Sequence, residues 1–226
     1  MITKKDFCAK QDHSCLGWVC PRETVRKFCN ETLAFGFASL VVNPDQVAYC
    51  RSVMEGRAGI GAVIGFPQGM NTTNIKIAEG LEAIENGATD LDVVTNFSLL
   101  FDGRDGLLLG EYRAFVNSMR DKKPDVVIKI IVYQPYGQNP SLNAGQTRRV
   151  SECVAESGAD FIKICCDLEA VQTVVAGRVQ IKHSGCAGLP EALEAIEKGC
   201  TRIGHEFAPI WLREAPEDFW GRSPAE

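Results

Sequence analysis

The chain has 226 residues, of which 45% are hydrophobic, and its net charge is −5. This length predicts one domain over residues 1–226, with a tail that frays after about residue 220. No block of like charge is present, which argues against nucleic acid and membrane surfaces as partners. No export signal or membrane-spanning run is visible, so we expect a cytoplasmic protein.

The chain contains ten cysteines, which is many for its length. No CxxC pair occurs and only three histidines are present, so the pattern does not predict a metal site. We interpret most of the cysteines as small buried side chains in a reducing compartment, where disulfides are not expected.

Three segments share one local pattern: ENGATDLDVV at 85–94, ESGADFIKIC at 156–165 and EKGCTRIGHE at 197–206. In each, an amphipathic stretch ends at a glycine and a β-rich run follows. This order is typical of a helix, a left-handed glycine cap and a strand. Looser copies surround Gly36 and Gly177.

The same alternation of helices and strands continues along the chain. Strands are expected near 7–12, 37–42, 59–64, 89–94, 126–132, 160–165, 178–182 and 201–204. Helices are expected near 22–33, 44–55, 73–86, 107–120, 141–157, 167–176, 189–198 and 206–219. Nearly continuous apolar strands indicate a parallel sheet covered on both faces. Eight strand–helix units therefore predict an α/β fold of the (β/α)8 TIM barrel type.

The glycine caps also indicate which residues lie at equal depth in the barrel. Counting five residues beyond a cap reaches Asp92, Lys163 and Lys182, near the carboxyl ends of three strands. The same count reaches Val41 and Gly204 in two other strands. Barrel enzymes carry their chemistry at this rim, so the three charged residues are candidate catalytic groups.

Two lysines beside one aspartate suggest a specific chemistry. Asp92 alone cannot neutralise Lys163 and Lys182, and both burial and mutual repulsion lower the pKa of a lysine. A neutral amine attacks carbonyl groups to form a Schiff base, and the carboxylate would move the protons. The alternative interpretation is a buried ion pair that has no chemical role.

Several motifs resemble one known family. FASLVVNPDQV, GAVIGFPQGMNTTNIKIAE, NGATDLDVV, VIKIIV, SGADFIKI and KGCTRIG follow in order and are similar to segments of deoxyribose-phosphate aldolases, over roughly residues 9–206. The resemblance implies a class I aldolase, a lyase on a (β/α)8 barrel whose mechanism needs no cofactor. It implies that Lys163 forms the Schiff base, that Asp92 relays protons and that Lys182 perturbs the nucleophile.

The resemblance assigns supporting roles to further residues. Lys129, in VIKIIV, matches a family lysine that reaches the site, with local pairing as the alternative. Asp12 and His13, in KQDHSCL, match an N-terminal segment of the family. We expect Asp12 to orient groups at the substrate site and His13 to be structural.

The regions that would bind phosphate depart from the family. After Lys163 the sequence is ICCDLEA, with Asp167 and no glycine, and KHSGCAG keeps Gly185 but has Cys186 in the place of a second glycine. A phosphate site normally uses a glycine-rich turn and free backbone amides at a helix start.

The last strand departs in the same way. In IGHEF, Gly204 is followed by Glu206 and Phe207 where the family has small hydroxyl residues. An ionised glutamate repels a phosphate dianion, and a phenylalanine fills the space. We therefore expect a non-phosphorylated acceptor, bound near Gly185 and Gly204, whose cationic or hydroxyl group meets Glu206 or Asp167.

Other residues are weaker candidates for the site. Tyr133 and Tyr136, after the fifth strand, could close over a substrate, and Cys165 and Cys166 could be reactive beside the lysine. Turn and core roles are the alternatives.

Two other functions remain open. One is a different Schiff-base lyase or a carbon–carbon bond-forming enzyme of specialised metabolism with another donor. The other is a non-catalytic barrel that binds a ligand. The expected partners are small aldehydes or ketones, and a homodimer with a second copy of the chain is a further expectation.

Overall fold

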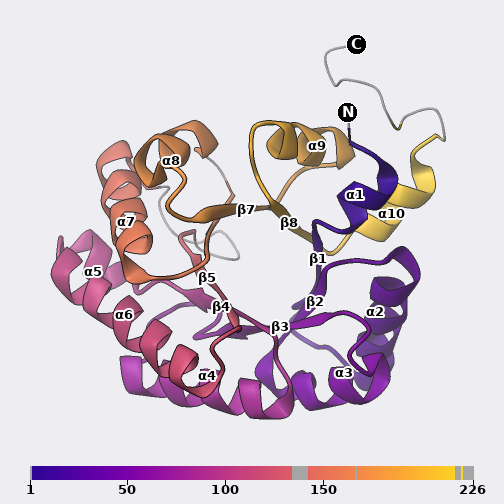
Figure 1. The fold of residues 1–226 in the computed structure, drawn as a ribbon, viewed down its shortest axis with the longest axis horizontal. Coiled ribbons are helices and arrows are strands. Elements are labelled where there is room, and N and C mark those ends of the chain that lie inside the picture. The colour runs from indigo at the N-terminus through magenta and orange to yellow at the C-terminus, as the bar shows by residue number, and fades with distance from the viewer. Residues whose placement is uncertain (1, 134–141, 166, 217–219, 221–226) are drawn as a thin grey trace.

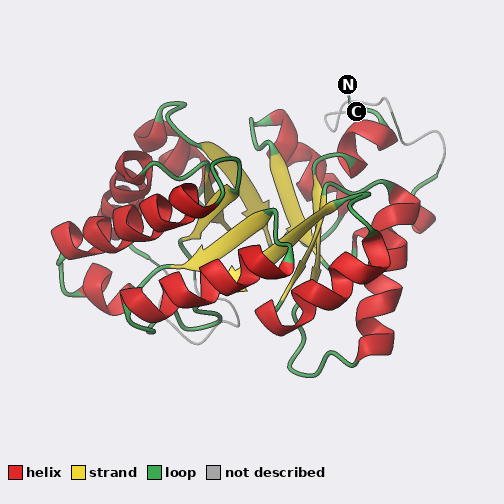
Figure 2. Cartoon of the chain, turned by 60° about the horizontal axis from the view of Figure 1, so that its bottom comes forward, coloured by secondary structure: helices red, strands yellow, loops and turns green. Residues whose placement is uncertain are grey.

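The computed structural model describes residues 2–133, 142–165, 167–216 and 220 (Figure 1). Eight parallel strands form a closed barrel in chain order, and the last strand pairs with the first. Helices surround the strands on the outside (Figure 2). This arrangement confirms the predicted (β/α)8 TIM barrel.

The elements have the following bounds. The strands are β1 Gln11–Cys15, β2 Ser39–Val42, β3 Gly59–Ile64, β4 Asp90–Val94, β5 Val127–Ile131, β6 Phe161–Ile164, β7 Gln180–Ser184 and β8 Arg202–His205. The helices are α1 Lys4–Cys8, α2 Arg22–Phe35, α3 Val47–Met54, α4 Thr73–Asn86, α5 Phe97–Phe101, α6 Asp105–Lys122, α7 Ala144–Ser157, α8 Leu168–Val175, α9 Leu189–Glu197 and α10 Ala208–Glu214, with a 3₁₀ turn η1 at Pro44–Gln46.

The start of the chain differs from the prediction. The strand expected at 7–12 is wrong, because residues 4–8 form α1 and the strand begins at Gln11. Thr3 and Asp6 form a capping box, in which the Asp6 amide donates to Thr3 Oγ1 at 3.1 Å and the Asp6 carboxylate accepts from the Thr3 amide at 3.2 Å. This reciprocal cap stabilises a helix start that the apolar pattern did not indicate.

Helix boundaries differ from the prediction at a few other points. The helix expected at 44–55 is divided into η1 and α3, because Pro44 starts a 3₁₀ turn. The helix α7 begins after a capping box between Asn143 and Gln146. The helix α10 ends at Glu214, and the helix end and tail predicted at 217–226 lie almost wholly outside the described residues.

The glycine caps hold the strands at the predicted depth. Gly36, Gly87 and Gly158 follow α2, α4 and α7 with φ of 68°, 113° and 87°, a region that favours glycine. In the resulting register Lys163 lies opposite Lys182. None of the described helices has the length and apolar character needed to cross a membrane.

Candidate active site

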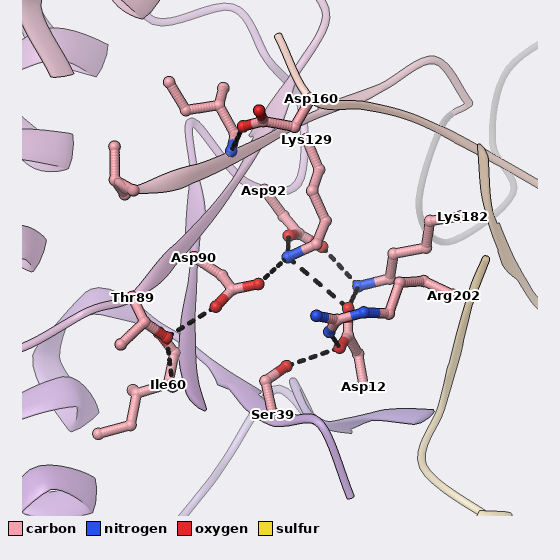
Figure 3. Close-up of polar contacts among 12 residues, drawn as sticks. Asp12, Ser39, Ile60, Thr89, Asp90, Asp92, Lys129, Asp160, Lys182 and Arg202 are labelled. Atoms are coloured by element: carbon pink, nitrogen blue, oxygen red, sulfur yellow. Dashed lines mark hydrogen bonds and ion pairs between the residues drawn. The ribbon is translucent and has the colours of Figure 1, made fainter. Parts of the chain in front are cut away.

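Charged side chains fill the inside of the barrel (Figure 3). The cluster consists of Asp12 on β1, Asp90 and Asp92 on β4, Lys129 on β5, Lys163 on β6, Lys182 on β7 and Arg202 on β8. All are buried except the partly exposed Arg202. Buried charges require partners, and the strand register provides them by placing opposite charges on neighbouring strands.

Asp92 is the centre of this cluster. The Nζ atoms of Lys163 and Lys182 each lie 2.9 Å from its Oδ2, and Nζ of Lys129 lies 3.3 Å from its Oδ1. Burial alone would raise the pKa of Asp92, but the charges of Lys129, Lys182 and Lys163 hold that pKa well below its usual range. Asp92 is therefore a carboxylate that contacts three amines.

Asp12 forms the second centre. Its Oδ2 lies 2.7 Å from Nζ of Lys182, and its Oδ1 accepts from Ser39 Oγ at 2.8 Å and from the Arg202 guanidinium. The charge argument from the sequence counted Asp92 alone against the two lysines, but Asp12 is a second carboxylate for Lys182.

The two fully buried lysines differ in their electrostatics. Lys129 lies 2.5 Å from Asp90 Oδ1, and although burial disfavours its charge, Asp92, Asp90 and Asp12 raise its pKa above the usual value. The pKa of Lys182 is lowered, because burial and the charges of the other lysines outweigh its carboxylate partners. Lys129 thus remains a cation, whereas Lys182 gives up a proton more easily than an ordinary lysine.

A cavity of about 310 Å³ lies over the carboxyl ends of the strands. Its described lining residues are Ser14, Leu16, Gly17, Phe66, Tyr133, Lys163, Ser184, Gly185, Gly204, His205 and Glu206. Lys163 is the one lysine in this described lining, so it is the amine that a small molecule in the cavity can meet. Among the described residues, no group of three or more His, Cys, Asp or Glu side chains is placed to hold a metal ion.

Comparison with known proteins identifies the family. A deoxyribose-phosphate aldolase from Caldicellulosiruptor saccharolyticus is 31% identical over 215 residues, covering 90% of this chain and 95% of the relative. The deoxyribose-phosphate aldolase from Geobacillus sp. is 32% identical over 205 residues, covering 85% and 88%. The chain belongs to the deoxyribose-phosphate aldolase family. No protein-family model matches it.

Solved structures agree with this assignment. The structure described as QR15, an aldolase, superposes with a TM-score of 0.82 at 29% identity and covers 92% of this chain and 95% of its own. A deoxyribose phosphate aldolase from Aeropyrum pernix, described as having a unique tetrameric structure, superposes with a TM-score of 0.82 at 23% identity over 93% and 91%. The chain is therefore an aldolase, a lyase that acts on small molecules.

The site residues predicted from the sequence fall into two layers of this aldolase. Lys163, Gly185, Gly204 and Glu206 line the cavity. The other four, Asp92, Lys182, Lys129 and Asp12, are fully buried and are not among its described lining residues. For Asp12 and Lys129 we therefore propose support of the buried cluster in place of direct contact with substrate.

Two expectations about the neighbouring loop change. Asp167, expected to meet the acceptor, lines a separate cavity of about 580 Å³ together with residues of α8 and α9. Cys165 lines that second cavity as well, while Tyr136 and Cys166 lie outside the described residues. Of the two acidic candidates, only Glu206 lines the active-site cavity.

Gly204 has a steric role in this aldolase. A Cβ atom at this position would lie 2.7 Å from Ser184 Oγ and 2.8 Å from Lys182 Cε. Such distances are shorter than van der Waals contact, so the missing side chain provides the space that Lys182 occupies. The sequence had indicated Gly204 as a member of the repeat and as a substrate-binding position, but not this steric role.

Further residues of the site were missed. Asp90, Ser184 and Arg202 each lie two positions from a predicted residue, on the same face of a strand, and the period of two could have indicated them. Glu79 was also missed: it accepts the Gly65 amide at 2.7 Å, beside the Phe66 that lines the cavity. No sequence signal distinguishes Glu79 from other glutamates on helices.

Proposed function

We propose that this chain is a class I aldolase in which Lys163 forms a Schiff base with a small aldehyde or ketone and the acceptor carries no phosphate. The observation that carries the proposal is the position of Lys163. It lines the cavity, and its Nζ lies 2.9 Å from a buried carboxylate that also pairs with Lys182. This combination of an accessible amine, a proton carrier and a neighbouring cation is what imine chemistry requires.

The charge balance of the cluster supports a neutral amine. Four cationic side chains (Lys129, Lys163, Lys182 and Arg202) face three carboxylates (Asp12, Asp90 and Asp92), which leaves one excess positive charge when all are ionised. Loss of one proton balances the cluster. The pKa of Lys182 is lowered, and Lys182 shares an Asp92 oxygen with Lys163, so we assign the lost proton to this pair of amines. Lys163 is the member of the pair that faces the cavity.

The reaction then follows from these positions. The Lys163 nitrogen adds to the donor carbonyl and forms a carbinolamine, which loses water to become an iminium. Removal of a proton from the carbon next to the iminium gives an enamine. We assign the transfer of protons on this side of the amine, in both directions, to the Asp92 carboxylate. The enamine carbon attacks the acceptor aldehyde, and hydrolysis of the new iminium releases the product and the lysine.

The lack of a phosphate site is supported by how the helix starts are satisfied. The Phe207 amide, at the start of α10, donates to His205 Nδ1 at 3.0 Å, and Pro209 has no amide hydrogen to offer. Before α9, the Ala187 amide donates to Glu191 Oε2 at 2.7 Å. Two amides that could bind an anion, those of Phe207 and Ala187, are therefore already occupied by groups of the chain itself.

Glu206 adds to this argument. It lines the cavity, and its carboxylate would lie near any anion bound at the start of α10. The relatives are named for deoxyribose phosphate, whereas we infer for this chain an acceptor with a hydroxyl or cationic group facing Glu206.

Borohydride trapping tests the proposal. The protein is incubated with acetaldehyde and reduced, and the lysines are mapped by peptide mass spectrometry. The expected result is a two-carbon adduct on Lys163, with none on Lys76, a buried lysine that pairs with Glu111 outside the cavity. An unmodified Lys163 with acetaldehyde and with larger ketones would contradict the Schiff base. Comparing phosphorylated and unphosphorylated acceptor aldehydes by product analysis tests the second part.

A further inference from the structure

A pair of cysteines lies in the loop that forms one wall of the cavity. Cys15 is the last residue of β1 and Cys20 closes the loop before α2, and their Sγ atoms are 3.8 Å apart. The loop curves around the second thiol, since Cys20 Sγ also lies 3.4 Å from the Gly17 carbonyl. A disulfide needs the two sulfur atoms at about 2.05 Å, so closure requires a movement of less than about 2 Å.

The loop between these cysteines belongs to the active site. Ser14 precedes the pair, and Leu16 and Gly17 lie within it, and all three line the cavity that holds Lys163. Trp18 and Val19, at the tip, are largely exposed. A bond between the ends of this short loop would therefore fix the shape of one wall of the cavity without touching the charged cluster.

We infer that Cys15 and Cys20 form a reversible disulfide that changes how the cavity accepts its substrate. The effect on substrate binding rests on the proposed aldol reaction, whereas the disulfide itself does not.

The chemistry balances with a peroxide as the oxidant. Cys20, which is partly exposed, attacks the peroxide oxygen and becomes a sulfenic acid, releasing water. Cys15 then attacks the Cys20 sulfur, the S–S bond forms and a second water leaves. Two thiols lose two hydrogens and two electrons, and hydrogen peroxide is reduced to two waters.

The environments of the two thiols set the order of these steps. Burial, together with the neighbouring Cys20, raises the pKa of Cys15 to about 12, so Cys15 is not the first thiol to react. Once Cys20 is oxidised, the Cys15 thiol lies only 3.8 Å from the Cys20 sulfur, and this proximity compensates for the low nucleophilicity of Cys15.

Peptide mapping after oxidation tests the disulfide independently of activity. The folded protein is treated with hydrogen peroxide, alkylated without reductant and digested with trypsin. The peptide of residues 11–22 contains Cys15 and Cys20 and no other cysteine. The expected peptide is unalkylated and lacks two hydrogens, and dithiothreitol restores both thiols. A Cys200→Ala control, which removes a buried thiol at the amino end of β8, should keep this product, and Cys20→Ser should lose it.

Two results would overturn the inference. One is a Cys20 oxidised to the sulfinic acid while Cys15 remains free to alkylate. The other is a disulfide that forms without changing KM. We expect the disulfide to raise KM several-fold with kcat nearly unchanged, and dithiothreitol to restore the original KM. Failure of the Lys163 trap would instead count against the proposed reaction and leave the mass measurement valid.

Discussion

Lys163 and Lys182 lie opposite each other in the ladder between β6 and β7, and their Nζ atoms are both 2.9 Å from the same oxygen of Asp92. Two amines that share one carboxylate oxygen are coupled electrostatically, so a change at either one alters the protonation of the other. This relationship makes Lys182 the residue whose replacement is most informative about Lys163, the proposed nucleophile.

Replacing Lys182 by methionine should lower kcat by about 100-fold at neutral pH and move the activity optimum to more alkaline pH. The substitution leaves three cations and three carboxylates, so the cluster loses the excess positive charge that favours release of a proton. The pH profile of kcat measures the effect. Lys182→Arg keeps the charge and should keep the optimum closer to that of the parent. An unchanged optimum in Lys182→Met would show that Lys182 does not set the state of Lys163.

Gly204→Ala should reduce activity much more than it reduces stability. The new Cβ would meet Ser184 Oγ at 2.7 Å and Lys182 Cε at 2.8 Å, so the lysine has to move from Asp92 and Asp12. The matched control is Gly106→Ala in α6, where nothing lies within 4 Å of the added atom. That change should stabilise the protein by about 0.5–1 kcal/mol and leave kcat unchanged. Equal activities in the two variants would contradict the steric role of Gly204.

The fold could be predicted because each unit of the sequence carries its own signals. Glycine caps such as Gly87 and Gly158 mark where a helix ends, and the apolar strands follow at fixed distance. A period that repeats eight times also corrects local errors, which explains why the missed helix at 4–8 did not disturb the topology.

The site could be predicted only in part, because pairing across strands depends on register. Counting along each strand identified Asp92, Lys163 and Lys182, but it could not show that Asp12 contacts Lys182 across the closure of the barrel. The period of two could have indicated Arg202 itself, but not its contact with Asp12, since β8 meets β1 only after the sheet is closed. Long-range partners of this kind become visible only in three dimensions.

Replacing Glu206 by serine should create weak inhibition by inorganic phosphate in an enzyme that otherwise resists it. The serine removes a charge that repels an anion and supplies a hydroxyl at the cavity wall. The measurement is competitive inhibition of aldol cleavage by inorganic phosphate, in the variant and in the parent enzyme. Glu206→Gln separates the two causes, because it removes the charge without supplying the small hydroxyl. Strong inhibition of the parent enzyme by micromolar phosphate would contradict the inferred loss of the phosphate site.

Acid should destabilise the protein as soon as the pH falls below the ordinary range of histidine. Burial lowers the pKa of His13, His183 and His205, which are all the histidines of the chain. Below about pH 6.5 the unfolded chain binds protons that the folded chain does not, so the free energy of unfolding decreases as pH falls. Each histidine contributes up to about 1.4 kcal/mol per pH unit while it stays neutral in the fold.

Urea denaturation at about pH 7.5 and about pH 5.5 measures this dependence, because the two values bracket the pKa of a free histidine. The lowered pKa values of Asp92 and Asp12 stabilise the fold above the ordinary aspartate range, so their contribution is lost only at lower pH. His183→Asn should flatten the decrease between the two pH values, since it removes one of the three groups. A free energy of unfolding that rises on acidification would show that the histidines are protonated in the folded protein.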